Sequence, residues 1–368
     1  MDNVKSPTAW DSARRILAVR LDNMGDVLMT TPALRALRRP GRHVTLLASA
    51  SGATVVPFVP EIDGVIVAAM PWLPHAPTDP DSLAEMVAAL RAEEFDAAVI
   101  FTVYSQNPLP AAFLCWLAGI PLRLAHCREN PYHLLSDWVP DPEPHEQIRH
   151  EVRRQLDLVG TVGCVAADEH LSFRVCPEDA ARAIAKLRQS GVDPEGRWIV
   201  VHPGATAPSR RYPPEHFAAV AERLAETPHA QLVFTGDAAD RELIDAIIAR
   251  IRTPAVSLAG LLSLGELGAV LAPAALLVAN NTGPVHIAAA LGTPVVDLYA
   301  LTNPQHGPWQ VPSRVLYHDV PCRFCYRSVC PQGHHDCLRL LDPQRVAQAA
   351  KELLEMGAER SVPARSGS

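Results

Sequence analysis

Short apolar runs rich in branched side chains alternate with helical patterns along most of this 368-residue chain. Alternation of this kind favours a parallel sheet with helices on both of its faces. We therefore expect an α/β fold. A length of 368 residues, at roughly 100–200 residues per domain, favours two domains.

The expected elements fall into two consecutive α/β halves. The first half contains expected strands at 15–20, 44–48, 65–68 and 97–101 and expected helices at 26–38, 82–94, 109–118 and 146–159. After a polar stretch at 176–197 the pattern restarts, with strands at 198–202, 232–235, 276–279 and 295–298 and helices at 214–226, 239–251, 284–291 and 343–356. The boundary between the halves is expected between residues 165 and 197.

Composition and charge narrow the class of protein. Hydrophobic residues make up 48% and charged residues 20% of the chain, which is typical of a globular protein. The net charge of -7 carries no basic excess, so a nucleic-acid partner is not expected. The N-terminal segment has no apolar core, and Glu266 and Pro273 interrupt the longest apolar stretch. A cytoplasmic protein with buried, reduced thiols at Cys115, Cys127, Cys164 and Cys176 is the expectation.

Loops that follow parallel strands hold the candidate site residues, because ligands bind outside the carboxyl ends of such strands. The loop Leu21-Asp22-Asn23-Met24-Gly25-Asp26 follows the first strand and ends where a helix begins. Asp26 has two interpretations there. It caps the helix, as Asp often does, or it is a carboxylate that accepts a proton from a substrate hydroxyl. Asp22 is a second carboxylate in the same loop and a rival for that role.

Loops of the second half offer groups suited to a diphosphate. The segment His202–Pro213 contains Thr206 and two arginines, Arg210 and Arg211, just ahead of an expected helix. It forms either an anion cradle or an ordinary loop with solvated arginines. The segment Asn280–His286 precedes another helix, whose first N–H groups can hold a pyrophosphate without a metal.

Two further positions in this half are less specific. His286 lies on the first turn of its helix, where a structural and a functional role are equally open, and Gly236 follows a strand and could line a nucleotide pocket. The chain lacks GxGxxG after a strand, GxxxxGK[ST], HExxH and GxSxG, which disfavours dinucleotide enzymes, P-loop nucleotidases, zincins and α/β-hydrolases.

Four cysteines cluster near the C-terminus within sixteen residues, with His334 and His335 between them. Four thiolates can hold zinc or an iron–sulfur cluster, and the alternative is a compact loop with reduced thiols. A metal here would be structural and would take no part in catalysis. The candidate ligands are Cys322, Cys325, Cys330 and Cys337.

Taken together, these segments resemble glycosyltransferase family 9, whose best-known members are ADP-heptose:lipopolysaccharide heptosyltransferases. The matching segments are ILAVRLDNMGDVLMTTPALRALR, VVHPGATAPSRRYPPEHF, VFTGDAADREL and NNTGPVHIAAALGTPVVDLY, and the tail CRFCYRSVCPQGHHDCLRLLDP is similar to tails of some members. The resemblance extends from about residue 15 to about 355, and the order and spacing of the segments make it specific.

The resemblance implies a GT-B architecture, in which two Rossmann-like doubly wound domains face an interdomain cleft. Residues 1–180 would form an N-terminal acceptor-binding domain and residues 181–342 a C-terminal sugar-nucleotide-binding domain. Residues 343–368 would form a helix that returns toward the first domain, followed by a tail.

The resemblance also implies an inverting reaction that needs no cofactor, with Asp26 as the general base. One departure concerns the position before the Thr-Gly pair, where family members commonly have Asp and this chain has Asn281. An amide supplies both a donor and an acceptor but no charge, which bears on the identity of the donor sugar. The implied donor-binding residues are Thr206, Arg210, Gly236, Asn281, Thr282, Gly283 and His286.

The expected function is transfer of a sugar, a heptose from ADP-heptose, to a hydroxyl of a lipopolysaccharide core or related surface glycan. The expected partners are this nucleotide-sugar donor and a glycan or glycolipid acceptor, with at most peripheral membrane contact. Two alternatives stay open. One is a transferase of the same family with a secondary-metabolite acceptor or another donor sugar. The other is a non-catalytic sugar-nucleotide-binding protein with a cysteine-bound metal.

Overall fold

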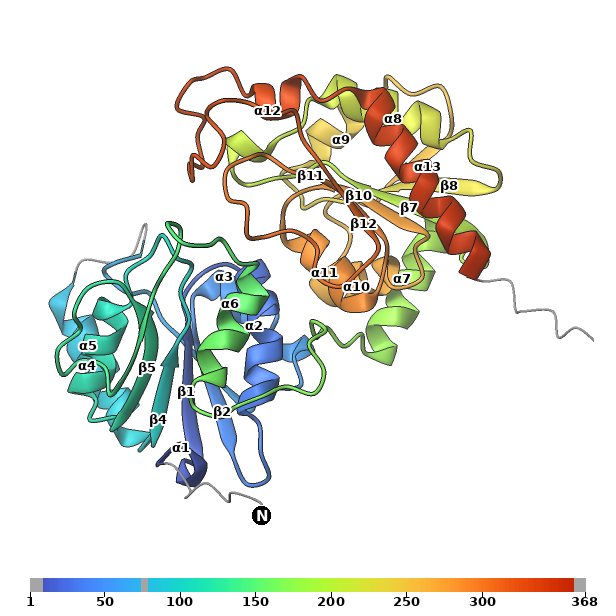
Figure 1. Ribbon diagram of the computed structural model, residues 1–368. Coiled ribbons are helices and arrows are strands. Elements are labelled where there is room, and N and C mark those ends of the chain that lie inside the picture. The colour runs from blue at the N-terminus through green and yellow to red at the C-terminus, as the bar shows by residue number, and fades with distance from the viewer. Residues whose placement is uncertain (1–8, 74–78, 361–368) are drawn as a thin grey trace, which may run out of the picture. The chain divides into compact units, whose positions relative to one another are not determined.

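The computed structural model describes residues 9–73 and 79–360 of the chain (Figure 1). The chain divides into two compact units, with the division after Ser172. This division lies within the predicted range 165–197. The predicted domain boundary at residue 180 falls inside helix α7 (Pro177–Gln189), which packs on α10 (Leu264–Leu271) and belongs as a whole to the second unit.

The first unit is built around a six-stranded sheet in the order β3-β2-β1-β4-β5-β6, and every neighbouring pair is parallel. Its strands are β1 (Arg15–Arg20), β2 (His43–Ala48), β3 (Gly64–Val67), β4 (Ala97–Ile100), β5 (Leu122–Cys127) and β6 (Asp137–Pro140). Its helices are α1 (Ala9–Ser12), α2 (Met24–Leu37), α3 (Ala50–Ala53), α4 (Pro80–Ala92), α5 (Leu109–Leu117) and α6 (Glu151–Gly160), with a 3₁₀ turn at Val56–Phe58.

The second unit repeats this plan with the strand order β12-β11-β10-β7-β8-β9, again entirely parallel. Its strands are β7 (Arg197–His202), β8 (Ala230–Phe234), β9 (Ala255–Ser257), β10 (Leu276–Asn280), β11 (Val295–Leu298) and β12 (Ser313–Leu316). Beside α7 and α10 it contains α8 (Pro214–Leu224), α9 (Arg241–Ile248), α11 (Gly283–Leu291), α12 (Asp336–Arg339) and α13 (Pro343–Arg360), with a 3₁₀ turn at Pro208–Arg210.

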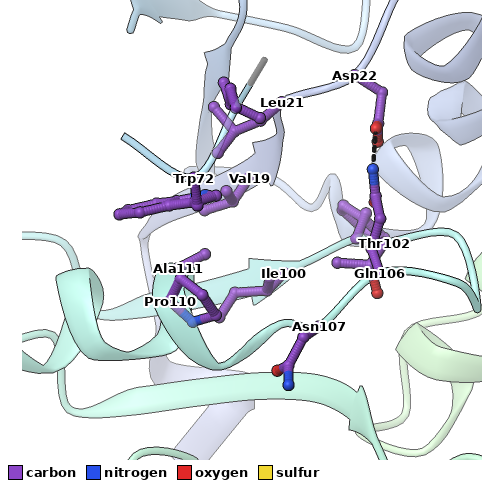
Figure 2. A pocket seen from close by; sticks show the side chains of 12 residues that line it. Val19, Leu21, Asp22, Trp72, Ile100, Thr102, Gln106, Asn107, Pro110 and Ala111 are labelled. Carbon is purple, nitrogen blue, oxygen red and sulfur yellow. Dashed lines mark hydrogen bonds between the residues drawn. The ribbon is translucent and has the colours of Figure 1, made fainter. Parts of the chain in front are cut away.

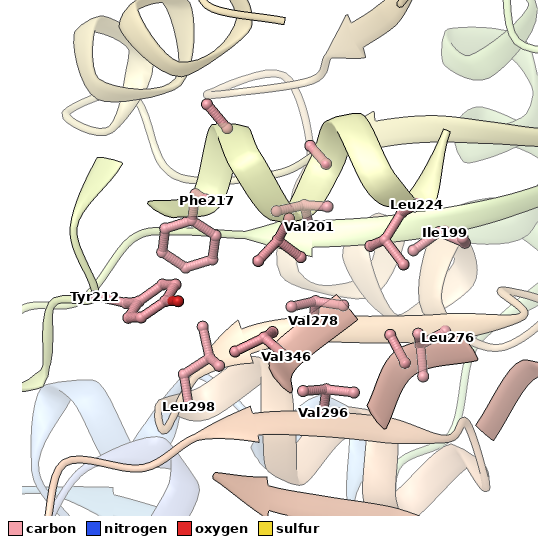
Figure 3. Close-up of a cluster of buried hydrophobic side chains, with 14 of the residues drawn as sticks. Ile199, Val201, Tyr212, Phe217, Leu224, Leu276, Val278, Val296, Leu298 and Val346 are labelled. Atoms are coloured by element: carbon pink, nitrogen blue, oxygen red, sulfur yellow. The ribbon is translucent and has the colours of Figure 1, made fainter. Parts of the chain in front are cut away.

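The central strands are apolar on both faces because helices cover both faces of each sheet. In the second unit, Val201 of β7, Val278 of β10 and Val296 of β11 lie in one buried cluster with Phe217 of α8 (Figure 3). A parallel strand that is buried on both faces is apolar along its whole length, so apolar and polar residues do not alternate in it. The α/β class predicted from the sequence is confirmed.

The final helix, α13, packs against α8, β10, β11 and β12 of the second unit. Its Val346 and Leu353 are buried in the same cluster as Phe217, and Lys351 forms an ion pair of 2.9 Å with Glu226 at the edge of that contact. These contacts make α13 part of the core of the second unit. The return of this helix toward the first domain stays a prediction.

No helix among residues 9–73 and 79–360 combines the length and the apolar character needed to cross a membrane.

Candidate active site

Each sheet has one point at which the chain reverses the direction in which it adds strands. In the first unit that point lies between β1 and β4, because β2 and β3 extend the sheet on one side and β5 and β6 on the other. The loops that leave β1 and β4 therefore turn toward opposite faces of the sheet, and the space between them is where α/β proteins bind ligands.

A cavity of about 280 Å³ opens at this point (Figure 2). The loop after β1 contributes Asp22 to its wall, and the loop after β4 contributes Gln106 and Asn107. Trp72 adds a flat apolar surface. The full lining is Val19, Leu21, Asp22, Trp72, Leu73, Ile100, Phe101, Thr102, Gln106, Asn107, Pro110 and Ala111.

The polar groups of this cavity are fixed by one another. Gln106 donates from Nε2 to Asp22 Oδ1, as Figure 2 shows, and its Oε1 accepts from the backbone N–H of Val103 at 3.3 Å. A tryptophan beside amide and carboxylate groups suits a sugar, which presents an apolar ring face and a rim of hydroxyls. Sequence reasoning did not single out Trp72 or Gln106, since they come from loops without a motif.

Asp26 is the third residue of α2, whose N-cap residue is Asn23. Its Oδ2 accepts the backbone N–H of Asn23, the N-cap residue, at 3.2 Å, which is a helix-capping contact. Its Oδ1 lies 3.4 Å from Nη2 of Arg20, and the side chain is 15% exposed. The carboxylate is thus held by the helix start on one side and by a guanidinium on the other, and its role as a base stays a prediction.

Arg20 connects the two carboxylates of this loop and was missed by sequence reasoning. The side chain is fully buried at the end of β1, with Nε 3.1 Å from Asp22 and Nη2 2.9 Å from Glu151. Burial alone would lower the pKa of Arg20, but Asp22, Glu151 and Asp26 outweigh that effect and raise it. Arg20 therefore stays charged and holds Asp22 and Asp26 on the same side of the sheet.

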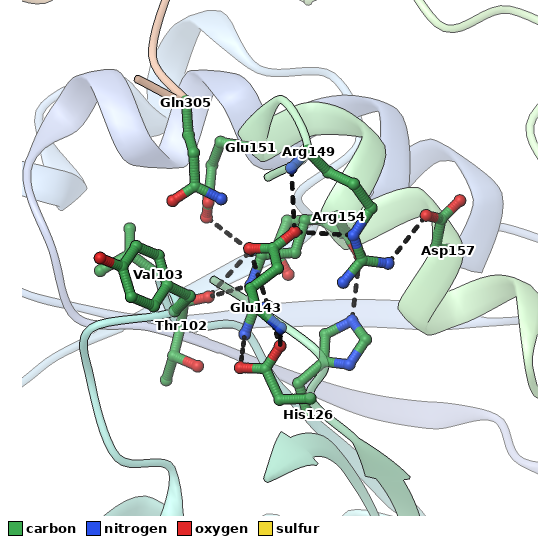
Figure 4. Close-up of polar contacts among 12 residues, drawn as sticks. Thr102, Val103, His126, Glu143, Arg149, Glu151, Arg154, Asp157 and Gln305 are labelled. Atoms are coloured by element: carbon green, nitrogen blue, oxygen red, sulfur yellow. Dashed lines mark hydrogen bonds and ion pairs between the residues drawn. The ribbon is translucent and has the colours of Figure 1, made fainter. Parts of the chain in front are cut away.

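A second layer of buried charges supports Arg20 from α6 (Figure 4). Glu151 is fully buried, and burial raises the pKa of its carboxyl although Arg20 opposes the rise. One turn further, Arg154 pairs with Asp141 at 2.7 Å and donates from Nε to the backbone of Thr102 at 3.1 Å. Because Thr102 lines the cavity, this network fixes the loop after β4 as well as Arg20.

The second unit has its reversal point between β7 and β10. The loop after β7 carries Thr206 and Arg210, and the loop after β10 carries Thr282 and Gly283. The neighbouring strand β8 leads to Gly236. The structure thus brings the predicted donor-binding residues to the carboxyl edge of three adjacent strands, whereas Asp26 belongs to the first unit.

Two glycines allow the loops after β7 and β8 to pack against the start of α9. A Cβ at Gly204 would lie 2.2 Å from Oδ2 of Asp240, and a Cβ at Gly236 would lie 2.8 Å from the Cβ of the same residue. Asp240 in turn accepts the backbone N–H of Asp237 at 3.1 Å. A side chain at Gly204 would displace the carboxylate of Asp240, and one at Gly236 would meet the Cβ of Asp240 and Cδ1 of Ile244, so Gly236 has a structural role beside its predicted one.

The two arginines of the loop after β7 have different surroundings. Arg211 donates from Nε to the backbone of Ala205 at 2.8 Å and so braces the loop itself. Arg210 is half-buried and lies close enough to the buried Asp297 to oppose the rise of that carboxyl's pKa. This difference favours Arg210 over Arg211 as the arginine available to an anion. Thr206 is exposed on the same loop.

The loop after β10 combines a helix start with buried polar groups. Thr282 is the N-cap residue of α11, Gly283 is its first residue, and His286 on its first turn is 4% exposed. Asn281 is also buried, and its Nδ2 donates to Asp297 Oδ2 at 2.9 Å and to the backbone of His306 at 2.9 Å. Both N–H groups of this amide are therefore used inside the second unit.

This contact explains why an amide suits position 281. Burial raises the pKa of Asp297 to about 8, against the hydrogen bond from Asn281 and the charge of Arg210. A carboxylate at position 281 would face that buried carboxyl at hydrogen-bond distance, whereas an amide donates to it.

Known proteins match the chain over nearly all of its length. A family model described as glycosyltransferase family 9 (heptosyltransferase) matches residues 83–335. The chain belongs to this family. Lipopolysaccharide heptosyltransferase 2 of Escherichia coli K12 is 28% identical over 92% of this chain and 98% of that protein.

Solved structures support the same assignment. A glycosyltransferase family 9 protein from Veillonella parvula DSM 2008 superposes with a TM-score of 0.78, at 24% identity, over 96% of this chain and 100% of that one. An ADP-heptose lipopolysaccharide heptosyltransferase II from E. coli gives a TM-score of 0.72, at 25% identity, over 94% and 99%. The protein is a glycosyltransferase with the GT-B fold, as predicted from the sequence.

Proposed function

We propose that this family 9 glycosyltransferase moves a heptose from ADP-heptose to a hydroxyl group of a lipopolysaccharide core or related surface glycan. The observation that carries the proposal is the pair Asp22 and Asp26, held by the buried Arg20 beside a cavity at the carboxyl edge of the first sheet. Similarity to lipopolysaccharide heptosyltransferase 2 of E. coli and to the solved E. coli ADP-heptose lipopolysaccharide heptosyltransferase II supports the donor and the acceptor.

The cavity of the first unit is the proposed acceptor site. Its volume of about 280 Å³ fits a single sugar ring with part of a neighbouring one. Trp72 would cover the apolar ring face, while Asp22, Gln106 and Asn107 would bind hydroxyls. An acceptor attached to a lipid would bring the enzyme into peripheral contact with the cytoplasmic face of a membrane.

The second unit is the proposed donor site. The diphosphate would lie against the start of α11 at Thr282 and Gly283, where the helix dipole favours a negative charge. Arg210 and Thr206 of the loop after β7 would add a fixed charge and a hydroxyl, with Gly236 and His286 lining the pocket. Asn281 contributes indirectly, because its amide N–H groups hold Asp297 and the backbone of His306.

The proposed reaction is a single displacement with inversion. The acceptor oxygen forms a bond to the anomeric carbon as the bond from that carbon to the diphosphate oxygen breaks, and the electron pair leaves with ADP. Asp26 takes the hydroxyl proton as the new bond forms. Arg210 and the N–H groups at the start of α11 stabilise the charge that develops on the diphosphate. The step requires no cofactor.

A mass-spectrometric screen of nucleotide sugars tests the proposal. Purified protein is incubated with ADP-, GDP- and UDP-linked sugars and a heptose-containing core oligosaccharide, and both the nucleotide released and the mass added to the acceptor are measured. Release of ADP together with an acceptor gain of one heptose is the expected result. Release of GDP or UDP, or transfer of another sugar, would contradict the proposed donor.

A non-catalytic sugar-nucleotide-binding protein is the alternative that this screen separates. Such a protein would bind ADP-heptose in calorimetry and release no nucleotide with any acceptor. That result would refute transfer while leaving the donor site in the second unit intact.

A further inference from the structure

Four cysteines that the proposed reaction does not use lie close together in the second unit: Cys322, Cys325 and Cys330 on one long segment, and Cys337 in α12, which follows it. Residues 317–335, between β12 and α12, form neither helix nor strand, although the structure describes all of them. A segment of this length without regular structure is uncommon in a compact domain unless something else organises it.

Two large apolar side chains of this segment are exposed. Val329 is 65% exposed and Phe324 is 38% exposed. Cys322, Cys325 and Cys330 are partly buried while most of their neighbours are exposed. The segment thus keeps its thiols partly buried while Phe324 and Val329 face outward.

The four thiols meet at one place. A cavity of about 20 Å³ is lined by all four cysteines of the cluster, together with His334 and His335. All four are free thiols. The cavity is as large as the space that one water molecule needs, so it has room for one ion.

We propose that Cys322, Cys325, Cys330 and Cys337 bind a single zinc or iron ion as four thiolates. Tetrahedral sites with four thiolates are typical of these metals. Among the described residues, no three potential ligands already stand in metal-binding geometry, so binding requires the thiols to rotate about their Cα–Cβ bonds. Each thiol gives up one proton to solvent as its bond to the metal forms.

His334 supports the site without acting as a ligand. The backbone N–H of Asp336 donates to its Nδ1 at 2.9 Å, so in the neutral ring the proton lies on Nε2. Nε2 lies 3.7 Å from Sγ of Cys322, which places an N–H donor against that sulfur. A hydrogen bond of this kind stabilises a thiolate ligand and leaves the four cysteines as the ligand set.

The metal would secure the loop that carries Thr206 and Arg210. Ser209 lines the same cavity and is buried. Its backbone N–H donates to the carbonyl of Ser328 at 3.1 Å, and its Oγ donates to the carbonyl of Arg327 at 2.9 Å. The cysteine segment is therefore hydrogen-bonded to the loop after β7, which gives the ion a structural role.

Metal analysis of the full-length protein tests the proposal. Wild type, Cys322→Ser and Cys330→Ser are expressed in medium containing both zinc and iron, purified without chelators, and measured by mass spectrometry of the elements. We expect about one equivalent of zinc or iron in wild type and at least a tenfold loss in both variants. Cys176→Ser is the matched control, because Cys176 is the N-cap residue of α7, a position where serine is favoured. It should keep the full equivalent.

A second measurement on wild type keeps the proposal open to refutation if the variants fail to fold. Metal-free protein is titrated with Co²⁺ under reducing conditions, and the thiolate-to-cobalt and ligand-field absorption bands are recorded. We expect the absorption bands of a tetrahedral cobalt site with four thiolates at one equivalent of Co²⁺. His334→Ala should keep these bands, with at most a lower intensity of the thiolate-to-cobalt band. Absence of metal and of cobalt bands, two disulfides in the cysteine segment, or stoichiometric acid-labile sulfide would each overturn the single-ion site.

Discussion

Replacement of Asp26 by asparagine separates its helix-capping contact from its proposed role as the general base. The carbonyl oxygen of an asparagine can still accept the backbone N–H of Asn23, so the helix-capping contact is kept. The change removes the negative charge 3.4 Å from Arg20 Nη2 and the ability to take a proton. Arg20 retains Asp22 and Glu151, so the cost to folding should stay at about 1–2 kcal/mol.

The cost to catalysis should be larger than the cost to folding. Loss of a general base lowers the rate by about 10²–10⁴, which corresponds to about 3–5 kcal/mol of activation free energy. We therefore expect Asp26→Asn to lower kcat by at least ~100-fold. Its affinity for the donor, measured by calorimetry, should stay unchanged because the proposed donor residues belong to the second unit.

Asp22→Asn is the matched control for Asp26→Asn. It makes the same chemical change on the same partner, Arg20, but at a carboxylate that lines the acceptor cavity and binds Gln106. We expect it to raise KM for the acceptor more than it lowers kcat. Steady-state kinetics with urea denaturation of each variant gives both quantities. A near-normal kcat in Asp26→Asn, or a collapse of kcat in Asp22→Asn alone, would refute the assignment of the base.

Three further outcomes are expected in the second unit. Arg210→Ala should weaken donor binding at least tenfold in calorimetry while Arg211→Ala stays within threefold, and equal effects would contradict the distinction between them. For Asp297, burial raises the pKa to about 8 from an ordinary 3.8, so the folded chain keeps a proton that the unfolded chain loses. The free energy of unfolding should therefore fall between pH 5 and pH 8, and Asp297→Asn should flatten that profile in denaturant titrations; an unchanged slope would refute the shift. Asn281→Asp should lose stability as the pH rises over the same range, and adding Asp297→Asn should restore it; a double variant no better than the single one would refute direct coupling.

The elements that the sequence predicted well are the central strands and the helices beside them. β1 and β11 match their predicted ranges, because short continuous apolar runs with β-branched residues, such as Ile16–Val19, favour a buried parallel strand. Helix ends shifted by a few residues, as with α2, which begins at Met24 and not at Asp26. Caps at helix ends depend on contacts that spacing alone does not show.

Helix α7 was missed for a different reason. The segment 176–197 was interpreted as a polar link, although Pro177 at the first position, acidic residues in the first turn and Ala183 and Leu187 on one face are all helix signals. Its narrow apolar face packs on α10, and that partner is distant in sequence. Strand β6 was missed because it lies at the edge of the sheet and is only half-buried. Strand β5 lies between β4 and β6, and it was missed because Arg123 and His126 interrupt its apolar residues.

The residues of the candidate site also differ in how well the sequence indicates them. The sequence places Thr282 and Gly283 at a strand end and a helix start, and the structure has them there, whereas their role in donor binding stays a prediction. Arg20, Glu151 and Trp72 were not found. Arg20 and Glu151 act through a contact between residues 131 positions apart, and Trp72 enters the cavity from a loop without any signature.

Position 281 shows why a departure from a family pattern has to be interpreted together with its spatial neighbour. Considered alone, the change from a charged to a neutral side chain suggests a different donor sugar. In the structure the same amide donates to Asp297, sixteen residues further along the chain, and to the backbone of His306. An aspartate at 281 would leave both acceptors without this donor and place two carboxyl groups in contact. The buried carboxyl at 297 is therefore sufficient reason for asparagine at 281, and this substitution by itself gives no argument against ADP-heptose as the donor.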